Sequence, residues 1–258
     1  MDLQIKDQLF VVTGSSSGFG RSIAEVLLAE GAHVMVNARG EEKLLELANS
    51  HPDKVEILQG DITTDAVISK LLRMLDGRII SGIVINAGGP PAKSFMNCVM
   101  EDWDQAYQNL LRWKVKLTKE LLPVFIGQKY GRIIFIESAS VKQPIENLIL
   151  STSLRLAVVG FVKTLSREVA EHGITLNVLA PGYHSTAAMQ RLFEAKSLLL
   201  GISPGDARKE FEKETATGKL GDPKDFASLA VWLLSPHSSF ITGQTISVDG
   251  GLIKGIMG

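Results

Sequence analysis

The chain has 258 residues, of which 45% are hydrophobic and 21% are charged, and its formal net charge is -1. That length and apolar content suffice for one large α/β domain with a full core. The near-zero charge gives no electrostatic reason to expect nucleic acid or an anionic membrane surface as a partner.

Cysteine usage and the N-terminus indicate a compartment. Cys98 is the single cysteine, which excludes an intramolecular disulfide and favours a reducing environment. The first residues, MDLQIKDQ, show no signal-peptide pattern, and no apolar run reaches the length of a membrane span. From these features we expect a cytoplasmic protein without a membrane partner. The five histidines are dispersed, so we expect no metal site.

Short apolar runs alternate with helical patterns along the whole chain. Most runs are continuously apolar, which is typical of strands buried on both faces of a parallel sheet. They predict strands at Leu9–Thr13, His33–Ala38, Val55–Gln59, Gly82–Ala87, Arg132–Glu137, Thr175–Ala180 and Thr245–Gly250. The helical patterns between them include Arg21–Ala29, Lys43–Ala48, Trp103–Leu122 and Ala157–Ala170. This alternation predicts one domain over residues 1–258, a Rossmann-type doubly wound parallel sheet of about seven strands with helices on both faces.

The segment 183–218 fits this alternation least well. Helical patches at Ala188–Ala195 and Asp206–Glu214 are separated by the sequence GISPGD. A surface excursion is one interpretation. The position after the sixth strand, at the sheet edge where ligands bind in such folds, favours a substrate-binding lid. After this segment, Asp222 and Pro223 predict a helix start, because Asp caps amides and Pro lacks only a donor that would be unpaired there.

The sequence TGSSSGFG, residues 13–20, follows the first strand directly and opens a helix. Glycines let the backbone turn tightly and approach a pyrophosphate, whose charge is stabilised by the amides of a helix N-terminus. A plain tight turn is the alternative, but the strand–turn–helix context favours a dinucleotide site. The contacts we expect here are Gly14, Ser16, Gly18, Phe19 and Gly20.

The end of the second predicted strand indicates which dinucleotide binds. An NAD site usually places a carboxylate there to accept a hydrogen bond from the ribose 2′-hydroxyl. This chain has Asn37, Ala38 and Arg39 instead. A guanidinium can grip a 2′-phosphate that a carboxylate would repel, although Arg39 could equally be a solvated turn residue. We therefore expect NADP(H) as the preferred cofactor, with NAD(H) as the alternative.

Taken in order, the motifs resemble those of the short-chain dehydrogenase/reductase family. The glycine-rich turn matches its TGxxxGxG pattern, and GDI at residues 60–62, NAG at 86–88 and PGxxxT at 181–186 match further motifs. The resemblance runs from Thr13 to the closing sequence VDGG at residues 248–251. It implies cofactor contacts from Asp61, Ile62, Asn86, Ala87, Gly88, Pro181, Gly182 and Thr186. The GDI and NAG motifs could instead simply end a strand or start a loop.

The stretch ESASVKQPIENLILSTSLR, residues 137–155, resembles the family's active site but carries different residues. The family pattern is a Ser at a strand end, a Tyr thirteen positions later and a Lys four beyond the Tyr. Here Ser138 is in place, while Ser151 and Arg155 stand at the other two positions. The resemblance implies that Ser138 meets the substrate carbonyl and that Arg155 also holds the cofactor ribose. A strand-end hydroxyl bonded to a loop amide is the alternative for Ser138.

The chemistry at these positions is altered. A phenol titrates near about 10 and is brought toward neutral pH by a neighbouring cation, whereas an aliphatic hydroxyl is far less acidic. Arg155 keeps the positive charge, but with a pKa above about 12 it does not relay a proton. Ser151 is therefore a poor proton donor, and capping the helix start is an equal alternative for it. Asn109 resembles the family's helix asparagine but falls one position early relative to Trp103.

Three other side chains are weaker candidates for proton transfer. Tyr183 and His184 follow the Pro-Gly turn near the expected nicotinamide position, and Lys142 follows Ser138 closely. A histidine can donate a proton near neutral pH. Each also has a plainer interpretation, as a packing aromatic, a solvated histidine or a surface lysine.

Two functions remain open at this point. The first is an NADP(H)-dependent oxidoreductase that acts on a small carbonyl or alcohol substrate with an atypical proton donor. The second is a catalytically impaired NADP(H)-binding sensor or scaffold. By resemblance to the family we expect a homodimer or homotetramer, with Trp103–Leu122 and Ala157–Ala170 supplying the contact faces.

Overall fold

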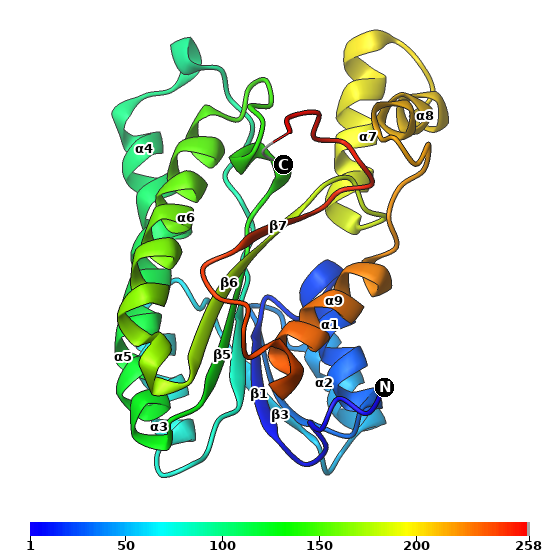
Figure 1. Cartoon of the computed structure of the whole chain (residues 1–258). Helices are drawn as coiled ribbons and strands as arrows, with labels where there is room; N and C mark the ends of the chain where they lie inside the picture. Colours follow the sequence, from blue (N-terminus) through cyan, green and yellow to red (C-terminus); the bar gives the residue numbers. More distant parts are fainter. Residues whose placement is uncertain (257–258) are drawn as a thin grey trace.

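The computed structural model describes residues 1–256 and shows one parallel sheet between two layers of helices (Figure 1). The sheet has seven strands in the order β3-β2-β1-β4-β5-β6-β7. Their bounds are β1 Leu9–Thr13, β2 His33–Ala38, β3 Val55–Gln59, β4 Gly82–Ile85, β5 Gly131–Ile136, β6 Ile174–Pro181 and β7 Thr245–Val248. The predicted doubly wound fold is confirmed. β4 and β7 end two residues earlier than expected.

Consecutive apolar residues in the strands serve opposite faces of the sheet. In β5, Ile134 and Ile136 belong to one core cluster, while Ile133 and Phe135 belong to the other. This two-sided burial is why the strands read as continuous apolar runs. Glu137, directly after β5, continues the alternation toward the face that carries Phe135.

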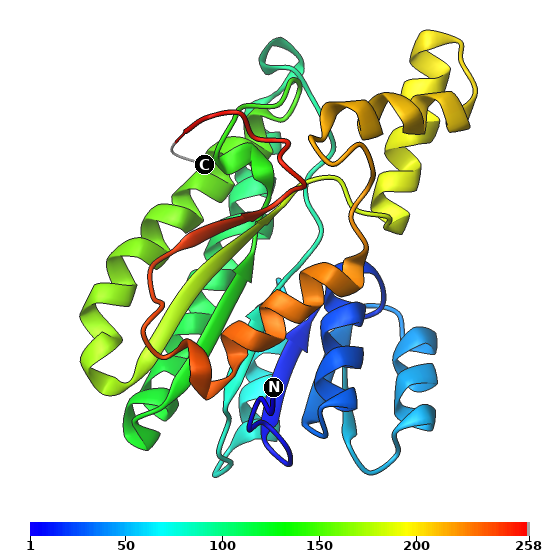
Figure 2. The ribbon, with the colours of Figure 1, turned by 45° about the vertical axis from the view of Figure 1, so that its right-hand side comes forward.

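The helices divide between the two faces. Core residues of α1 Gly18–Ala29, α2 Glu42–Ser50 and α9 Pro223–Leu234 pack on one face. Those of α3 Asp65–Leu75, α5 Trp113–Gln128 and α6 Ile149–Val169 pack on the other. Figure 2, turned by 45°, shows α9 beside α1 on its face of the sheet. α9 starts as predicted, because Asp222 accepts a hydrogen bond from the amide of Lys224 and Pro223 is the first helical residue.

The helix expected over Trp103–Leu122 is longer and interrupted. α4 covers Met100–Tyr107, a π-helical turn follows at Gln108–Arg112, and α5 continues to Gln128. A π-turn inserts an extra residue into the helical ladder, and such turns are frequent at functional sites. Here it places Asn109 in the wall of the cleft described below. The apolar periodicity did not reveal this insertion.

The segment predicted as a lid forms a helical hairpin at the carboxyl edge of the sheet (Figure 1). It consists of α7 Ala187–Leu200 and α8 Pro204–Glu214, both longer than predicted. The two helices share a small core separate from the two main ones, which includes Met189 and Phe193.

One helical segment in the described chain, 149–172, is long and apolar enough to cross a membrane by length and composition. α6, its main part, packs against β6, and its buried side includes Val158 and Val162 in the core. Its inward side also carries Arg155, paired with a buried carboxylate. These features are those of a helix that covers a sheet.

Candidate active site

A cleft of about 530 Å³ lies over the carboxyl ends of β1 to β5. In open parallel sheets this edge is where ligands bind, at the point where strand order reverses. All of the predicted cofactor residues line the cleft except Gly20, Pro181 and Gly182. The set that lines it is Gly14, Ser16, Gly18, Phe19, Arg39, Asp61, Ile62, Asn86, Ala87, Gly88, Arg155 and Thr186.

The glycine-rich turn brings backbone amides to the cleft. Gly14 and Gly18 have φ values of 62° and 56°, a region that other residues rarely adopt. A side-chain carbon on Gly20 would lie 2.3 Å from the carbonyl oxygen of Gly14, so this glycine lets α1 pack against the turn. Ser17 precedes α1 without a capping side-chain hydrogen bond, so the first-turn amides remain available to an anion. The turn therefore fits a pyrophosphate.

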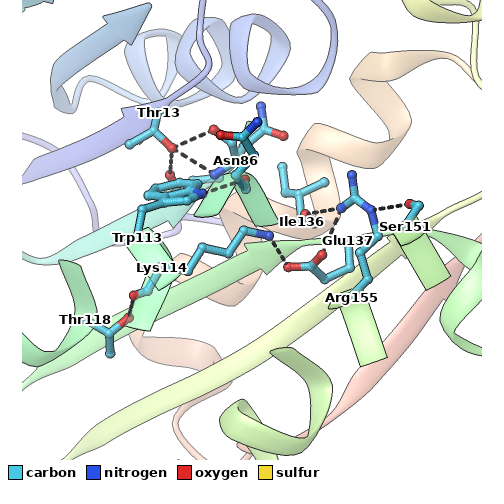
Figure 3. A network of polar contacts seen from close by, with 11 residues as sticks. Thr13, Asn86, Trp113, Lys114, Thr118, Ile136, Glu137, Ser151 and Arg155 are labelled. Carbon is cyan, nitrogen blue, oxygen red and sulfur yellow. Dashed lines mark hydrogen bonds and ion pairs between the residues drawn. The ribbon is translucent and has the colours of Figure 1, made fainter. Parts of the chain in front are cut away.

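The two central strands are tied together at the cleft floor. The Thr13 hydroxyl accepts a hydrogen bond from the Asn86 amide at 2.8 Å and lies 2.8 Å from the Asn86 carbonyl oxygen. The Asn86 side-chain amide donates to the Gly14 carbonyl at 3.3 Å. Asn86 thus holds the glycine turn at the end of β4, as shown in Figure 3 for Thr13 and Asn86.

The far end of the cleft has a carboxylate and a cation suited to an adenosine moiety. One oxygen of Asp61 accepts from the Thr63 amide at 3.0 Å and from its hydroxyl at 2.8 Å, which leaves the second oxygen for a ligand donor. Arg39 is exposed at the end of β2, and no ion pair involves it within residues 1–256. Asn37 is instead buried and donates to the carbonyls of Leu58 and Gly60. At the end of β2, Asn37 therefore holds neighbouring backbone together, and Arg39 is the residue that is available to a ligand.

The start of α7 forms the wall opposite the glycine turn. The Thr186 hydroxyl accepts from the Met189 amide and so caps α7. A side-chain carbon on Gly18 would lie 3.6 Å from Thr186, so the two walls approach each other closely there. Arg191, one helical turn further on, also lines the cleft. The hairpin therefore contributes a cation to the same space as the glycine turn.

The inner end of the cleft contains a buried ionic network (Figure 3). Arg155 donates through Nε to the Ser151 hydroxyl at 3.0 Å and through Nη1 to Glu137 Oε2 at 2.8 Å. The other oxygen of Glu137 accepts from Lys114 Nζ at 2.5 Å. All four side chains are buried, with Lys114 only 1% exposed. Two cations thus share one carboxylate.

The third nitrogen of Arg155 faces the cleft. A side-chain carbon on Gly89 would lie 3.1 Å from Nη2, and among residues 1–256 no protein hydrogen bond is made by this atom. Arg155 and Glu137 both line the cleft, together with Asn109 and Ile136. A ligand at this end therefore meets the guanidinium, behind which the Glu137 carboxylate is fully buried.

Comparison with known proteins identifies the family. A family model described as enoyl-(acyl carrier protein) reductase matches residues 14–253. The chain belongs to the short-chain dehydrogenase/reductase family. It is 33% identical over 251 residues to the 3-oxoacyl-[acyl-carrier-protein] reductase of Haemophilus influenzae, covering 96% of this chain and 99% of that protein. The corresponding reductase of Rickettsia bellii is 30% identical over 252 residues, with 97% and 99% coverage.

Solved structures of the same family agree with the fold. L-sorbose reductase from Gluconobacter frateurii, crystallised with NADPH and L-sorbose, superposes with a TM-score of 0.93 at 26% identity, covering 99% of this chain and 100% of that one. An NADPH-dependent reductase involved in bacilysin biosynthesis gives a TM-score of 0.91 at 26% identity, with 97% and 100% coverage. The predicted short-chain dehydrogenase/reductase assignment is therefore confirmed.

The reductase-like serines make local hydrogen bonds. Ser138 is half-buried after β5, and its hydroxyl accepts from the Ser140 amide at 3.1 Å, which is the local role considered for it. α6 begins at Ile149 without a side-chain cap, so Ser151 does not cap it. The Ser151 hydroxyl serves Arg155 instead. Lys142 is half-buried in the turn after Ser138.

Tyr183 and His184, the weaker candidates in this family member, lie outside the cleft wall. The Tyr183 hydroxyl donates to Glu214 at 2.9 Å, and burial together with that carboxylate raises the pKa of Tyr183 above its ordinary value. His184 is buried against Phe19, with ring centroids 5.0 Å apart, and burial lowers its pKa. Tyr183 therefore bonds within the 183–218 segment, whereas His184 packs against the main body, and neither contacts Arg155.

Two charged residues at the inner end of the cleft were not predicted from the sequence. Lys114 and Glu137 complete the network around Arg155, and sequence signals for both existed. Lys114 falls on the apolar stripe of its helix beside Trp113 and Leu117, where a charge needs a buried partner. Glu137 directly follows an apolar strand whose end faces the cleft.

Proposed function

We propose that the chain is an NADP(H)-dependent oxidoreductase that transfers hydride between the nicotinamide and a small carbonyl or alcohol substrate. The observation that carries this proposal is the continuous cleft from Arg39 to Arg155, which passes the glycine turn and Asn86. Relatives across nearly the whole chain are named as 3-oxoacyl-[acyl-carrier-protein] reductases, and a structural neighbour was crystallised with NADPH. Bound NADPH would supply the hydride.

NADP(H) is favoured over NAD(H) by the charge at the adenosine end. Arg39 provides a planar, always charged fork for a 2′-phosphate. The β2 end holds Ala38 where an NAD-specific acid would accept from the ribose hydroxyl. Asp61 would accept from the adenine amine, and Asn86 to Gly88 would line the ribose. One structural neighbour is described as NADPH-dependent, and another was crystallised with NADPH.

At the inner end we assign Arg155 to the cofactor ribose and the substrate oxygen, through its free Nη2. Ser138 would donate to the substrate carbonyl from the end of β5. Ser151 would orient Arg155, since its hydroxyl already accepts from Nε. An alcohol and a guanidinium are poor acids, so the proton donor of this member differs from the family's Tyr. The hairpin 183–218 would act as the substrate-binding lid.

The alternative of an impaired NADP(H)-binding sensor or scaffold has one observation in its favour. Ser151 lies within the network rather than among the cleft-lining residues. A protein that only binds the cofactor would need no acid at this end. This chain keeps polar residues at both altered positions, Ser151 and Arg155, and adds two buried charged residues, Lys114 and Glu137. These four residues favour an active site over a site that only binds the cofactor.

Turnover and binding assays separate the two functions. Wild type is mixed with NADPH and a panel of 3-oxoacyl thioesters, ketoses and simple ketones, while cofactor affinity is measured by calorimetry. We expect NADPH binding in the micromolar range and substrate-dependent oxidation of NADPH. Binding without turnover on any member of the panel supports the sensor, and failure to bind either dinucleotide contradicts both.

The double variant Ser151→Tyr with Arg155→Lys tests the altered site directly. If the native site uses a proton donor other than the family's Tyr, the double variant should turn over more slowly than wild type. A gain of activity that wild type lacks would show that the native site is degraded.

We also propose a homodimer or homotetramer that uses the outer faces of α5 and α6. These helices lie side by side on the outside of the sheet (Figure 1), and exposed apolar side chains there include Val124 and Leu156. Light scattering coupled to gel filtration measures the assembly, and a monomer at micromolar concentration would contradict this assignment.

A further inference from the structure

Arg191 is a cation in the cleft wall that the functions assigned so far do not use. It lines the cleft together with Ala187 and Ala188, which precede it by one turn on the same side of α7. The other lysines and arginines of the hairpin 183–218 all pair with carboxylates: Lys196 with Glu214, Arg208 with Glu212, Lys209 with Asp206 and Lys213 with Glu210. Among the described residues, Arg191 is the one lysine or arginine of the hairpin without an ion pair. Its charge is therefore available to a ligand in the cleft.

The first turn of α7 adds backbone donors beside Arg191. Thr186 caps the helix by accepting a hydrogen bond from the Met189 amide. The amides of Ala187 and Ala188 come before the first intrahelical bond, and neither finds an acceptor within residues 1–256. Free amides at a helix N-terminus and a guanidinium on the same side of that helix both favour a phosphate.

The opposite wall, the glycine turn, holds no cationic side chain. The turn residues that line the cleft are Gly14 and residues 16–19. Arg21 follows them closely, but it is bonded to Glu25 at 2.6 Å and to the carbonyl of Lys43, away from the cleft. The turn therefore offers a pyrophosphate backbone amides and no side-chain charge.

The geometry of the two walls selects the pyrophosphate as the partner of Arg191. A side-chain carbon on Gly18 would lie 3.6 Å from Thr186, so α1 and α7 begin close to each other across the cleft. Figure 1 shows the hairpin and α1 on the same side of the sheet. The other two cleft arginines lie elsewhere, Arg39 at the end of β2 and Arg155 at the inner end. A pyrophosphate on the glycine turn would thus meet the start of α7 on its other side.

We propose that Arg191 binds the pyrophosphate of the dinucleotide from the hairpin, opposite the amides of the glycine turn. This rests on the proposed NADP(H)-dependent function. The guanidinium presents a planar fork of donors with a permanent charge, which offsets phosphate charge that amides alone do not neutralise. Because α7 belongs to the hairpin, the same contact ties the predicted lid to the bound cofactor.

ADP-ribose and adenosine 2′-phosphate separate the two phosphate positions of NADPH. ADP-ribose carries the pyrophosphate without the 2′-phosphate or the nicotinamide, and adenosine 2′-phosphate carries the 2′-phosphate alone. Their affinities for wild type, Arg191→Met and Arg39→Ala are measured by calorimetry. We expect Arg191→Met to weaken ADP-ribose binding by about 5- to 30-fold and to change adenosine 2′-phosphate binding by less than about twofold. Arg39→Ala should show the reverse pattern.

Arg208→Met is the matched control on the same hairpin. Arg208 pairs with Glu212 at 2.8 Å and does not line the cleft, so its loss should leave both affinities unchanged. Arg191→Lys keeps the charge but loses the fork, and its affinity for ADP-ribose should lie between those of wild type and Arg191→Met. Added salt should weaken ADP-ribose binding less in Arg191→Met than in wild type, because the variant lacks one screened charge.

Limited proteolysis tests the tie between the hairpin and the cofactor. The side chains of Lys209 and Lys213 in α8 are 68% and 71% exposed, which makes them accessible to trypsin. With saturating ADP-ribose, we expect cleavage at these two lysines to slow by about threefold or more in wild type and to stay unchanged in Arg191→Met. Equal protection of both proteins would contradict the tie.

The outcomes separate this assignment from the reductase function. Unchanged ADP-ribose affinity in Arg191→Met overturns the assignment, and so does a loss confined to adenosine 2′-phosphate; either result leaves the reductase function intact. If wild type binds ADP-ribose and NADPH but reduces no carbonyl, the reductase function fails and the role of Arg191 stands. Failure of wild type to bind either ligand overturns both.

Discussion

Removing the carboxylate of Glu137 should destabilise the protein far more than removing the amine of Lys114. Glu137 neutralises two buried cations, at 2.8 Å from Arg155 and 2.5 Å from Lys114. Glu137→Gln leaves both cations without a counter-charge in a site that is largely shielded from water. Removing one partner of a buried pair typically costs about 3–5 kcal/mol, and we expect a loss in that range.

Lys114→Met has a different balance. It removes one cation and leaves Glu137 paired one-to-one with Arg155, so no buried charge is uncompensated. The lost attraction is offset by relief from burying an ammonium, and the methionine side chain fills similar volume. We expect a change in the free energy of unfolding of about 1 kcal/mol or less.

Urea unfolding, followed by tryptophan fluorescence at one fixed protein concentration, measures both changes. Trp113 is buried beside the network and reports on it. The difference between the variants should be at least about 2 kcal/mol. If Lys114→Met costs as much as Glu137→Gln, the assignment of two cations to one carboxylate is incorrect.

Three further outcomes follow from the structure. Arg39→Ala should weaken NADPH binding in calorimetry by about 5- to 30-fold, or about 1–2 kcal/mol with solvent screening, and should leave the NADH affinity unchanged. Equal losses of affinity for NADPH and NADH would contradict the assignment of Arg39 to the 2′-phosphate. The pKa of Lys114 is lower in the folded state than in the unfolded state, so the unfolded state binds more protons. The free energy of unfolding should therefore rise with pH up to about 10.4, the ordinary pKa of lysine. This rise should be smaller in Lys114→Met. Gly20→Ala should abolish cofactor binding and destabilise the fold, because the new side-chain carbon would clash with the Gly14 carbonyl oxygen. Gly160→Ala is the matched control, at an open position of α6, and should stabilise the protein by about 0.5–1 kcal/mol in thermal unfolding.

The doubly wound parallel sheet and the cofactor cleft could be predicted from the sequence because they depend on local signals. Continuous apolar runs marked the parallel strands, and the glycines at 14 and 18 marked backbone positions with positive φ. Parallel strands then bring their carboxyl ends to one edge, which is why motifs far apart in the chain line one cleft.

The network at the inner end was not predicted because it depends on distances across elements. Lys114 and Glu137 are 23 residues apart and meet only through the packing of α5 against the sheet. The π-turn at Gln108–Arg112, which directly precedes α5, has no periodic signature in the sequence. The local bond between Ser151 and Arg155, four residues apart on one helix face, could have been expected from spacing alone.

The central claim, that this chain reduces a carbonyl with hydride from NADPH, is tested most directly by isotope transfer. Wild type is incubated with NADPH deuterated at the transferable position of nicotinamide C4 and with the panel of 3-oxoacyl thioesters, ketoses and ketones, and the products are analysed by mass spectrometry. We expect one deuterium on the carbinol carbon of at least one alcohol product. Tight NADPH binding with no deuterium in any product would contradict the claim.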